Sequence, residues 1–155
     1  MFVCSSTRIL ITGLLSQIGT IQLVTQMTQY KIAASATDYR KAHELVKSEG
    51  LPDHPLNFPT VMAIQGDEVV GILGTDTSGE FIIAGPLVLK GDRLRAFTLI
   101  RLIDFYDAVM REAGVTAYIF SVEDGNTKWI DKIDKTFSLS PYAHKDGRAF
   151  YVRNL

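Results

Sequence analysis

The stretch from Glu80 to Gly114 constrains the fold more than any other part of this 155-residue sequence. Phe81 to Leu89 is an apolar run of strand length that is interrupted by Gly85-Pro86. Proline cannot donate a hydrogen bond to a neighbouring strand, so a Gly-Pro pair inside a strand predicts a β-bulge or a sheet edge. Lys90-Gly91-Asp92 then indicates a tight turn, with Asp92 as the N-cap of a helix.

From Arg93 to Gly114 the spacing of apolar residues becomes helical. One face carries Leu99, Leu102, Ile103, Tyr106, Val109, Met110 and Ala113, and the opposite face, which we expect to meet solvent, carries Arg101, Asp104, Asp107 and Arg111. A broken strand, a tight turn and a helix together aim the helix N-terminal N–H groups at one point, an arrangement that suits a phosphate. The alternative is that the strand and helix only build the core, as they do in most α/β domains.

The composition predicts one folded domain, because 46% of the residues are hydrophobic and 21% are charged. The net charge of −1 gives no basic footprint, so we do not expect nucleic acid as a partner. The single cysteine, Cys4, excludes an internal disulfide and a cysteine-based metal site, and His43, His54 and His144 show no ligand spacing. We therefore expect no metal. No apolar run has the length of a membrane span, and the cysteine content fits the cytoplasm, or a virion assembled there.

Residues 1–26 are apolar, but Ser16-Gln17 interrupts them and Arg8 is their one basic residue. A secretory signal would have a basic start and an unbroken apolar centre, so secretion is not favoured. We expect an N-terminal extension that is not essential for folding and contributes no site residue. It is either an extra strand or helix packed on the domain, or sequence that precedes a start at Met27; the choice between Met1 and Met27 stays open. Residues 27–155 are expected to form a single domain.

Apolar alternation and turn residues predict the remaining elements. The expected strands are Tyr30–Ala34, Thr60–Gln65, Glu68–Gly74, Phe81–Leu89, Thr116–Val122, Tyr142–His144 and Ala149–Arg153; the expected helices run from an N-cap at Thr37 to Gly50, from Arg93 to Gly114, and from Thr127 to Asp134. The order β-α-β-β-β-α-β-α-β-β predicts an α+β fold, with a mixed, mostly antiparallel sheet flanked by helices.

From Tyr30 to Arg153, this order and the bulged strand before the long helix resemble the GNAT N-acyltransferase superfamily. The resemblance implies that acetyl-CoA or another acyl-CoA is the co-substrate, and that a small-molecule or protein amine is the acceptor. In that family the strand–turn–helix unit holds the pyrophosphate of acyl-CoA through a motif of Arg or Gln, two residues, Gly, one residue, and Gly or Ala. The matching register is Arg93-Leu94-Arg95-Ala96-Phe97-Thr98, in which Ala96 and Thr98 replace the two small residues of the motif.

The resemblance also assigns residues in the second half of the chain. Asn126 stands where the family has an asparagine that contacts a pantetheine amide, although its position before a predicted helix favours the role of a helix N-cap. Ile133 stands where the family favours a tyrosine that protonates the leaving thiolate, and Thr136-Phe137-Ser138 replaces a Gly-Phe pair. These departures affect catalysis more than fold.

A second similarity is narrower. Gly125-Asn126-Thr127, the helix that follows and the His144-Lys145-Asp146-Gly147 hairpin are similar to GNAT-like proteins of short-tailed bacteriophages, some of which are virion proteins. Besides an amine acceptor, the partner of this chain could therefore be a virion protein or a second copy of the same chain.

Transfer of an acyl group needs a polarised carbonyl, a neutral amine and a protonated leaving thiolate. Gly85-Pro86 and the element order predict that the strands Phe81–Leu89 and Thr116–Val122 diverge from one another. A bulge at Gly85-Pro86 would also free strand N–H groups, such as that of Leu87 and with it Leu89, for the acyl-CoA. Glu80, at the start of the broken strand, and Glu123, at the end of the next, are the candidate bases; otherwise they are solvated strand ends.

Tyr142 and Tyr118 are the candidate acids, with core or hairpin positions as the alternative. Two functions follow from these residues: an acyl-CoA-dependent N-acyltransferase, or a non-catalytic GNAT-fold phage protein that acts as a virion component or binding module. Modification of nucleic acid, through Lys90, Arg93 and Arg95, is a weaker third hypothesis because of the net charge.

Overall fold

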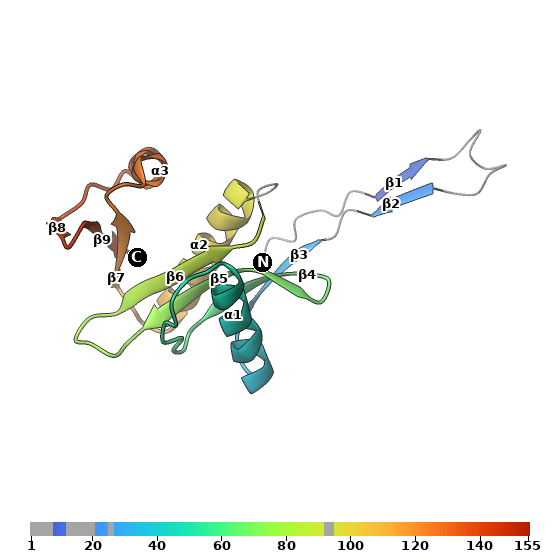
Figure 1. The fold of residues 1–155 in the computed structure, drawn as a ribbon, viewed down its shortest axis with the longest axis horizontal. Coiled ribbons are helices and arrows are strands. Elements are labelled where there is room, and N and C mark those ends of the chain that lie inside the picture. Colours follow the sequence, from blue (N-terminus) through green and yellow to red (C-terminus); the bar gives the residue numbers. More distant parts are fainter. Residues whose placement is uncertain (1–7, 12–20, 25–26, 92–94) are drawn as a thin grey trace.

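A computed structural model describes residues 8–11, 21–24, 27–91 and 95–155. Seven strands form one sheet in the order β3-β4-β5-β6-β7-β9-β8, and three helices flank it (Figure 1). Every neighbouring pair in this sheet is antiparallel except β6 and β7, which are parallel. The predicted α+β class and the mixed, mostly antiparallel sheet are therefore confirmed.

The elements of the chain follow the predicted order after an additional N-terminal strand pair. They are β1 (Arg8–Ile11), β2 (Ile21–Val24), β3 (Thr28–Ile32), α1 (Ala36–Ser48), β4 (Val61–Gln65), β5 (Glu68–Asp76), β6 (Ile83–Leu89), α2 (Arg95–Glu112), β7 (Ala117–Glu123), α3 (Thr127–Phe137), β8 (Ala143–Lys145) and β9 (Arg148–Asn154).

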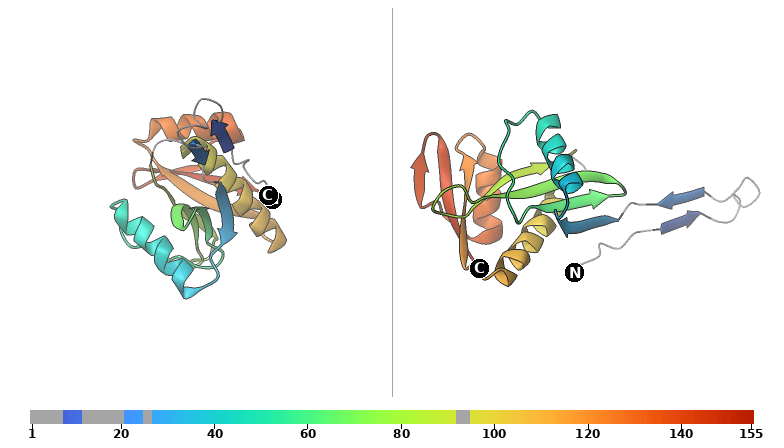
Figure 2. Two further views of the ribbon diagram at one scale, coloured as in Figure 1. Left: turned by 90° about the vertical axis from the view of Figure 1, so that its right-hand side faces the viewer. Right: turned by 90° about the horizontal axis from the view of Figure 1, so that it is seen from below.

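The helices cover opposite faces of the sheet, as Figure 2 shows. On β4, Met62 packs in one core cluster with Leu45 of α1, while the adjacent Val61 packs in another with Leu102 of α2. Successive side chains of a strand point to opposite faces, so α1 and α2 lie on different sides of the sheet. Trp129 of α3 belongs with the α2 cluster, which places α3 on the α2 face of the sheet.

Helix α1 begins with a capping box. Ser35, not the predicted Thr37, is the N-cap: its Oγ accepts from the Asp38 N–H at 3.1 Å, and the Asp38 carboxylate accepts in return from the Ser35 N–H at 3.3 Å. The prediction missed by two residues because both Ser and Thr are good caps and only Ser35 has the acidic partner at the third position. The Ala34 N–H and the Lys31 ammonium also contact Asp38, and together they lower its pKa to about 2.

We expect Asp38→Asn to lower the free energy of unfolding at pH 6 by about 1 kcal/mol, the usual value of a helix cap. The pKa of Asp38 is lower in the folded chain than its ordinary 3.8, so its contribution is present above about pH 4 and is lost as the pH falls toward 2. Urea unfolding of both proteins from pH 6 to pH 3 should show the difference shrinking. A difference that stayed constant over this range would contradict the assignment.

Strands β1 and β2 form a two-stranded sheet of their own, with Arg8 opposite Val24 and Ile11 opposite Ile21. They add no strand to the seven-stranded sheet. A chain shortened to begin at Met27 is therefore expected to keep its melting temperature within about 3 °C, the shift that corresponds to roughly 1 kcal/mol for a domain of this size. Differential scanning calorimetry measures this shift, and loss of the cooperative transition would show that the extension belongs to the core.

The prediction that Asp107 faces solvent is wrong. Leu102, Tyr106 and Met110 of α2 are buried as expected, but Asp107 is also only 2% exposed. Its carboxylate accepts hydrogen bonds from the Tyr118 hydroxyl, at 2.7 Å, and from the Arg153 guanidinium, at 2.7 and 3.2 Å. The helical spacing placed Asp107 on the solvent face because it takes no account of partners that are remote in sequence. The partners of this carboxylate lie on β7 and β9.

Candidate functional site

The sheet opens between β6 and β7. Their one register pair is Ile83 with Ile119, and the Ile119 N–H donates to the Ile82 carbonyl at 3.0 Å. Beyond this point the two strands are not paired: Leu89, at the end of β6, has no partner on β7, and Glu123, at the end of β7, has none on β6. The predicted divergence of these two strands is thus confirmed; the gap between them is called the split below.

A bulge on β6 begins at the narrow end of the split. Leu87 lies opposite Leu73, and Ala84 lies opposite Thr75, so three steps along β6 match two along β5. The extra residue falls at Gly85-Pro86, as predicted. Gly85 has φ of +151°, a conformation that glycine adopts at little cost. A Cβ on Gly74 would come within 2.9 Å of the Gly85 carbonyl oxygen, so the bulge lies tightly against β5.

Two backbone N–H groups of β6 face the split. The Lys90 N–H donates to the Val70 carbonyl of β5 at 2.8 Å. Because successive N–H groups of a strand point to opposite sides, those of Leu87 and Leu89 point away from β5, toward β7. The register of the described strands pairs neither with a β7 residue. The edge therefore offers the strand donors that the bulge predicted, at Leu87 and Leu89.

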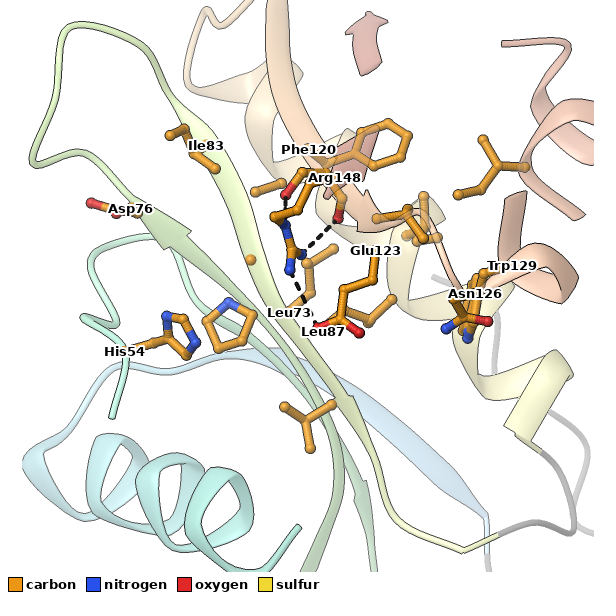
Figure 3. A pocket seen from close by; sticks show the side chains of 18 of the residues that line it. His54, Leu73, Asp76, Ile83, Leu87, Phe120, Glu123, Asn126, Trp129 and Arg148 are labelled. Carbon is orange, nitrogen blue, oxygen red and sulfur yellow. Dashed lines mark hydrogen bonds and ion pairs between the residues drawn. The ribbon is translucent and has the colours of Figure 1, made fainter. Parts of the chain in front are cut away.

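A cavity of about 810 Å³ occupies the split, and Figure 3 shows it from close by. Leu87, Phe120 and Trp129 contribute apolar surface to its wall, and Glu123 and Arg148 contribute charge. The loop between α1 and β4 borders the cavity with residues that include His54. The space is of the size of small-molecule sites in proteins.

Asn126 lines the cavity from the start of α3. It is at the N-cap position, and its backbone carbonyl accepts from the Trp129 and Ile130 N–H groups, each at 3.1 Å. Its side chain makes no capping hydrogen bond. The alternative role as a side-chain N-cap is therefore not realised, and the amide of Asn126 lies beside Trp129 on the cavity wall (Figure 3).

The three candidate catalytic residues lie in different places. Glu123 lines the cavity at the end of β7, and its carboxylate lies 3.5 Å from Nη1 of Arg148. Glu80 is exposed in the bend before β6, which begins at Ile83 rather than at Glu80. Tyr142 precedes β8, is 57% exposed and packs beside Phe150. Neither Glu80 nor Tyr142 is among the residues that line the cavity.

The segment predicted to hold the pyrophosphate is only partly described. Asp92, Arg93 and Leu94 lie outside the described residues, and Arg95 and Ala96 open α2 with side chains that are not described. Phe97 is partly exposed, with the Arg101 guanidinium 5.1 Å from its ring centre. Thr98 is buried, so its side chain belongs to the packed face of α2.

Two further residues bear on proton transfer to a leaving group. Tyr118 lines the cavity, but its hydroxyl donates to Asp107, and burial together with the Asp107 charge raises its pKa. Ile133, at the position of the tyrosine of the family, is buried with Ala149 and Tyr151. Of the described residues that line the cavity, none therefore offers a free tyrosine hydroxyl.

Arg148 is the residue that sequence reasoning missed. It lines the cavity, with its Nε 2.9 Å from the Ser121 hydroxyl. The only signal in the sequence is its position directly after the predicted Lys145–Gly147 turn, which does not show that β9 brings it opposite Glu123. Within the described part of the chain, no cluster of three or more His, Cys, Asp or Glu residues could hold a metal ion. No described helix is both long enough and apolar enough to cross a membrane.

The divergent parallel pair, the bulged strand and the helices on both faces define the GNAT fold. Solved structures agree. An aminoglycoside 6'-acetyltransferase type Ii is similar with a TM-score of 0.65 at 14% identity, over 81% of this chain and 96% of that one. The Thermoplasma acidophilum PaiA N-acetyltransferase, solved with coenzyme A, has a TM-score of 0.65 at 10% identity, over 83% and 99%.

The Escherichia coli ribosomal-protein-S18-alanine N-acetyltransferase has a TM-score of 0.61 at 13% identity, over 81% of this chain and 91% of that one. At these identities the comparison establishes the fold but not the substrate, which has to be inferred from the residues of the site. No protein-family model matches the sequence, and no curated protein matches it either. None of these three structures is described as a phage protein.

Proposed function

We propose that the chain is an acyl-CoA-dependent N-acyltransferase that acts on a small-molecule or protein amine. The observation that carries the proposal is the free edge of β6 in the split, where the N–H groups of Leu87 and Leu89 face a cavity of about 810 Å³. A pantetheine arm is an extended chain with two amides, so it can bond to a strand edge as a further strand would. The Asn126 amide and the Trp129 ring on the opposite wall fit the same arm.

The residues of the site can carry out most of the chemistry. Bound acyl-CoA would supply an activated thioester, and the Leu87 N–H beside the bulge is the donor available to polarise its carbonyl. Glu123 can accept a proton from the amine directly or through water, and its carboxylate lies 3.5 Å from Nη1 of Arg148. Glu80 as a base and Tyr142 as an acid stay predictions from the sequence. Solvent water can protonate the leaving sulfur.

A second candidate is a non-catalytic protein of the same fold, a binding module or a virion component of the kind found in short-tailed phages, acting through a partner chain or as a homodimer. The buried Ile133 and the Tyr118 hydroxyl bound to Asp107 favour this candidate, because they leave the cavity without a tyrosine acid. This candidate gives no role to the free N–H groups at the edge of β6.

Isothermal titration with acetyl-CoA and with CoA tests the proposal. Binding near the micromolar range supports the enzyme, whereas no binding at millimolar concentration would sink the proposal. A thiol-release assay with a panel of amines then separates catalysis from binding alone. Glu123→Gln should lower the rate of thiol release while leaving the dissociation constant of CoA unchanged. Glu112→Gln is the matched control, because Glu112 is an exposed carboxylate at the end of α2 that does not line the cavity.

A further inference from the structure

Arg148 holds an unusual place at the free edge of β7. It lies directly opposite Glu123 in the β7–β9 pair, so both side chains leave the same face of the sheet. Its Nη2 lies 3.4 Å from the Ser121 carbonyl oxygen, its Nε 2.9 Å from the Ser121 hydroxyl, and its Nη1 3.5 Å from the Glu123 carboxylate. Figure 3 shows these contacts as dashed lines, with the labelled Glu123 beside the guanidinium.

The guanidinium replaces a missing sheet contact. The Ile119 N–H donates to β6, so by alternation the Ser121 carbonyl, two residues on, also points toward β6. Because the strands diverge after Ile119, no β6 residue reaches that carbonyl, and Arg148 binds it instead. A guanidinium has five N–H donors, and the contacts of Arg148 with Ser121 and Glu123 use three of them. Two donors of Arg148 are left at the narrow end of the split.

Arg148 lies on the α1 face of the sheet. Phe120 and Val122 pack with α3, and strand alternation places Ser121 and Glu123 on the other face. The other charged or titratable residues that line the cavity near this face are Glu49, His54 and Asp76. Arg153 also lines the cavity, but its guanidinium is bound to the buried Asp107. Among the described residues that line the cavity, Arg148 is thus the cation whose N–H donors are still available to a ligand.

We propose that Arg148 binds a carboxylate of the substrate at the narrow end of the split. Two free donors of a guanidinium match the two oxygens of a carboxylate. The carboxylate belongs either to an amino-acid acceptor or to the far end of a dicarboxylic acyl chain. Glu123, 3.5 Å from Arg148, would pair with the ammonium group of a free amino acid, which favours the acceptor. The inference rests on the proposed function and narrows its substrate class.

Two arms of one binding experiment distinguish the sources. In the acceptor arm, each of the twenty common amino acids is compared with its carboxamide, by thermal shift and then calorimetry, with and without CoA. In the donor arm, succinyl-CoA is compared with acetyl-CoA. In one arm the wild-type protein should bind the carboxylate member roughly tenfold more tightly, about 1.4 kcal/mol. This is near the low end for charge-assisted bonds, because the Arg148 side chain is 41% exposed.

Three variants assign the preference to Arg148. Arg148→Gln should bring the ratio of the two dissociation constants to about one, and Arg148→Lys should retain part of it, since lysine keeps the charge without the fork. Lys145→Gln is the matched control: Lys145 lies opposite Arg148 on β8, is exposed and does not line the cavity, so the ratio should not change. A merely structural role of Arg148 would change both affinities together and leave their ratio intact.

The inference fails if neither arm shows a preference for the carboxylate, or if the preference survives Arg148→Gln. The proposed function is judged separately, by binding of CoA to the wild-type protein, because CoA carries no acyl carboxylate. CoA binding without a carboxylate preference would overturn only the inference. A carboxylate preference in the acceptor arm without any CoA binding would overturn only the acyl-CoA function.

Discussion

Asp107→Ala is expected to lower the free energy of unfolding by about 3–5 kcal/mol, the cost of removing one partner from a buried ion pair. Asp107 is only 2% exposed, and its carboxylate joins α2 to Arg153 of β9 and Tyr118 of β7. Without it, the Arg153 guanidinium, whose side chain is 20% exposed, is left without its anion, and the buried Tyr118 hydroxyl loses its acceptor. The loss would lower the melting temperature by on the order of 10 °C.

Chemical unfolding of the Asp107→Ala variant, compared with that of the Asp104→Ala variant, measures this change in the free energy of unfolding. Asp104 is an exposed carboxylate on the same helix, so its removal should change stability by no more than about 0.5 kcal/mol. The double variant Asp107→Leu/Arg153→Leu should recover part of the loss, because it removes both charges. Equal stability of the two single alanine variants would show that the buried contact contributes little.

Arg93→Ala is expected to weaken CoA binding roughly 10- to 150-fold, which corresponds to about 1.5–3 kcal/mol for a charge-assisted contact with a pyrophosphate. Arg93 lies outside the described residues, between the end of β6 at Leu89 and the start of α2 at Arg95. The prediction combines its place in the family motif with the helix N-terminal N–H groups that follow it. Added salt should weaken the wild-type interaction, because the contact is electrostatic.

Calorimetry with CoA checks this prediction once wild-type binding has been measured. Arg111→Ala is the matched control, since it removes the same charge from the last turn of α2. Wild-type binding that Arg93→Ala leaves intact would contradict the motif register, and Lys90 and Arg95 would be the next positions to replace. Lys90 forms an ion pair with Glu68, so a loss at Lys90 would have to be separated from the loss of that pair.

The sequence by itself determined the features that depend on neighbours in the chain. The strand and helix order follows from apolar periods of two and 3.6 residues. The bulge follows from Gly85-Pro86, because proline cannot bond within a ladder and glycine accepts the required backbone angles. The split was predicted from the order together with this bulge, and both are present. Where element ends differ from the prediction they do so by one to three residues, as at Ser35 and Ile83, because caps and strand pairing set the ends.

Only the tertiary structure decided which polar groups meet. Asp107 and Arg153 are 46 residues apart, and Ser121 and Arg148 are 27 apart, so no local pattern relates them. The helical period placed Asp107 in solvent because it weighs polarity alone, whereas burial of a carboxylate depends on whether remote donors satisfy it. Arg148 reaches the split only because the β7–β9 register sets it opposite Glu123 while β6 turns away. Strand register and divergence arise from packing of the whole sheet, and they decide which charges line the cavity.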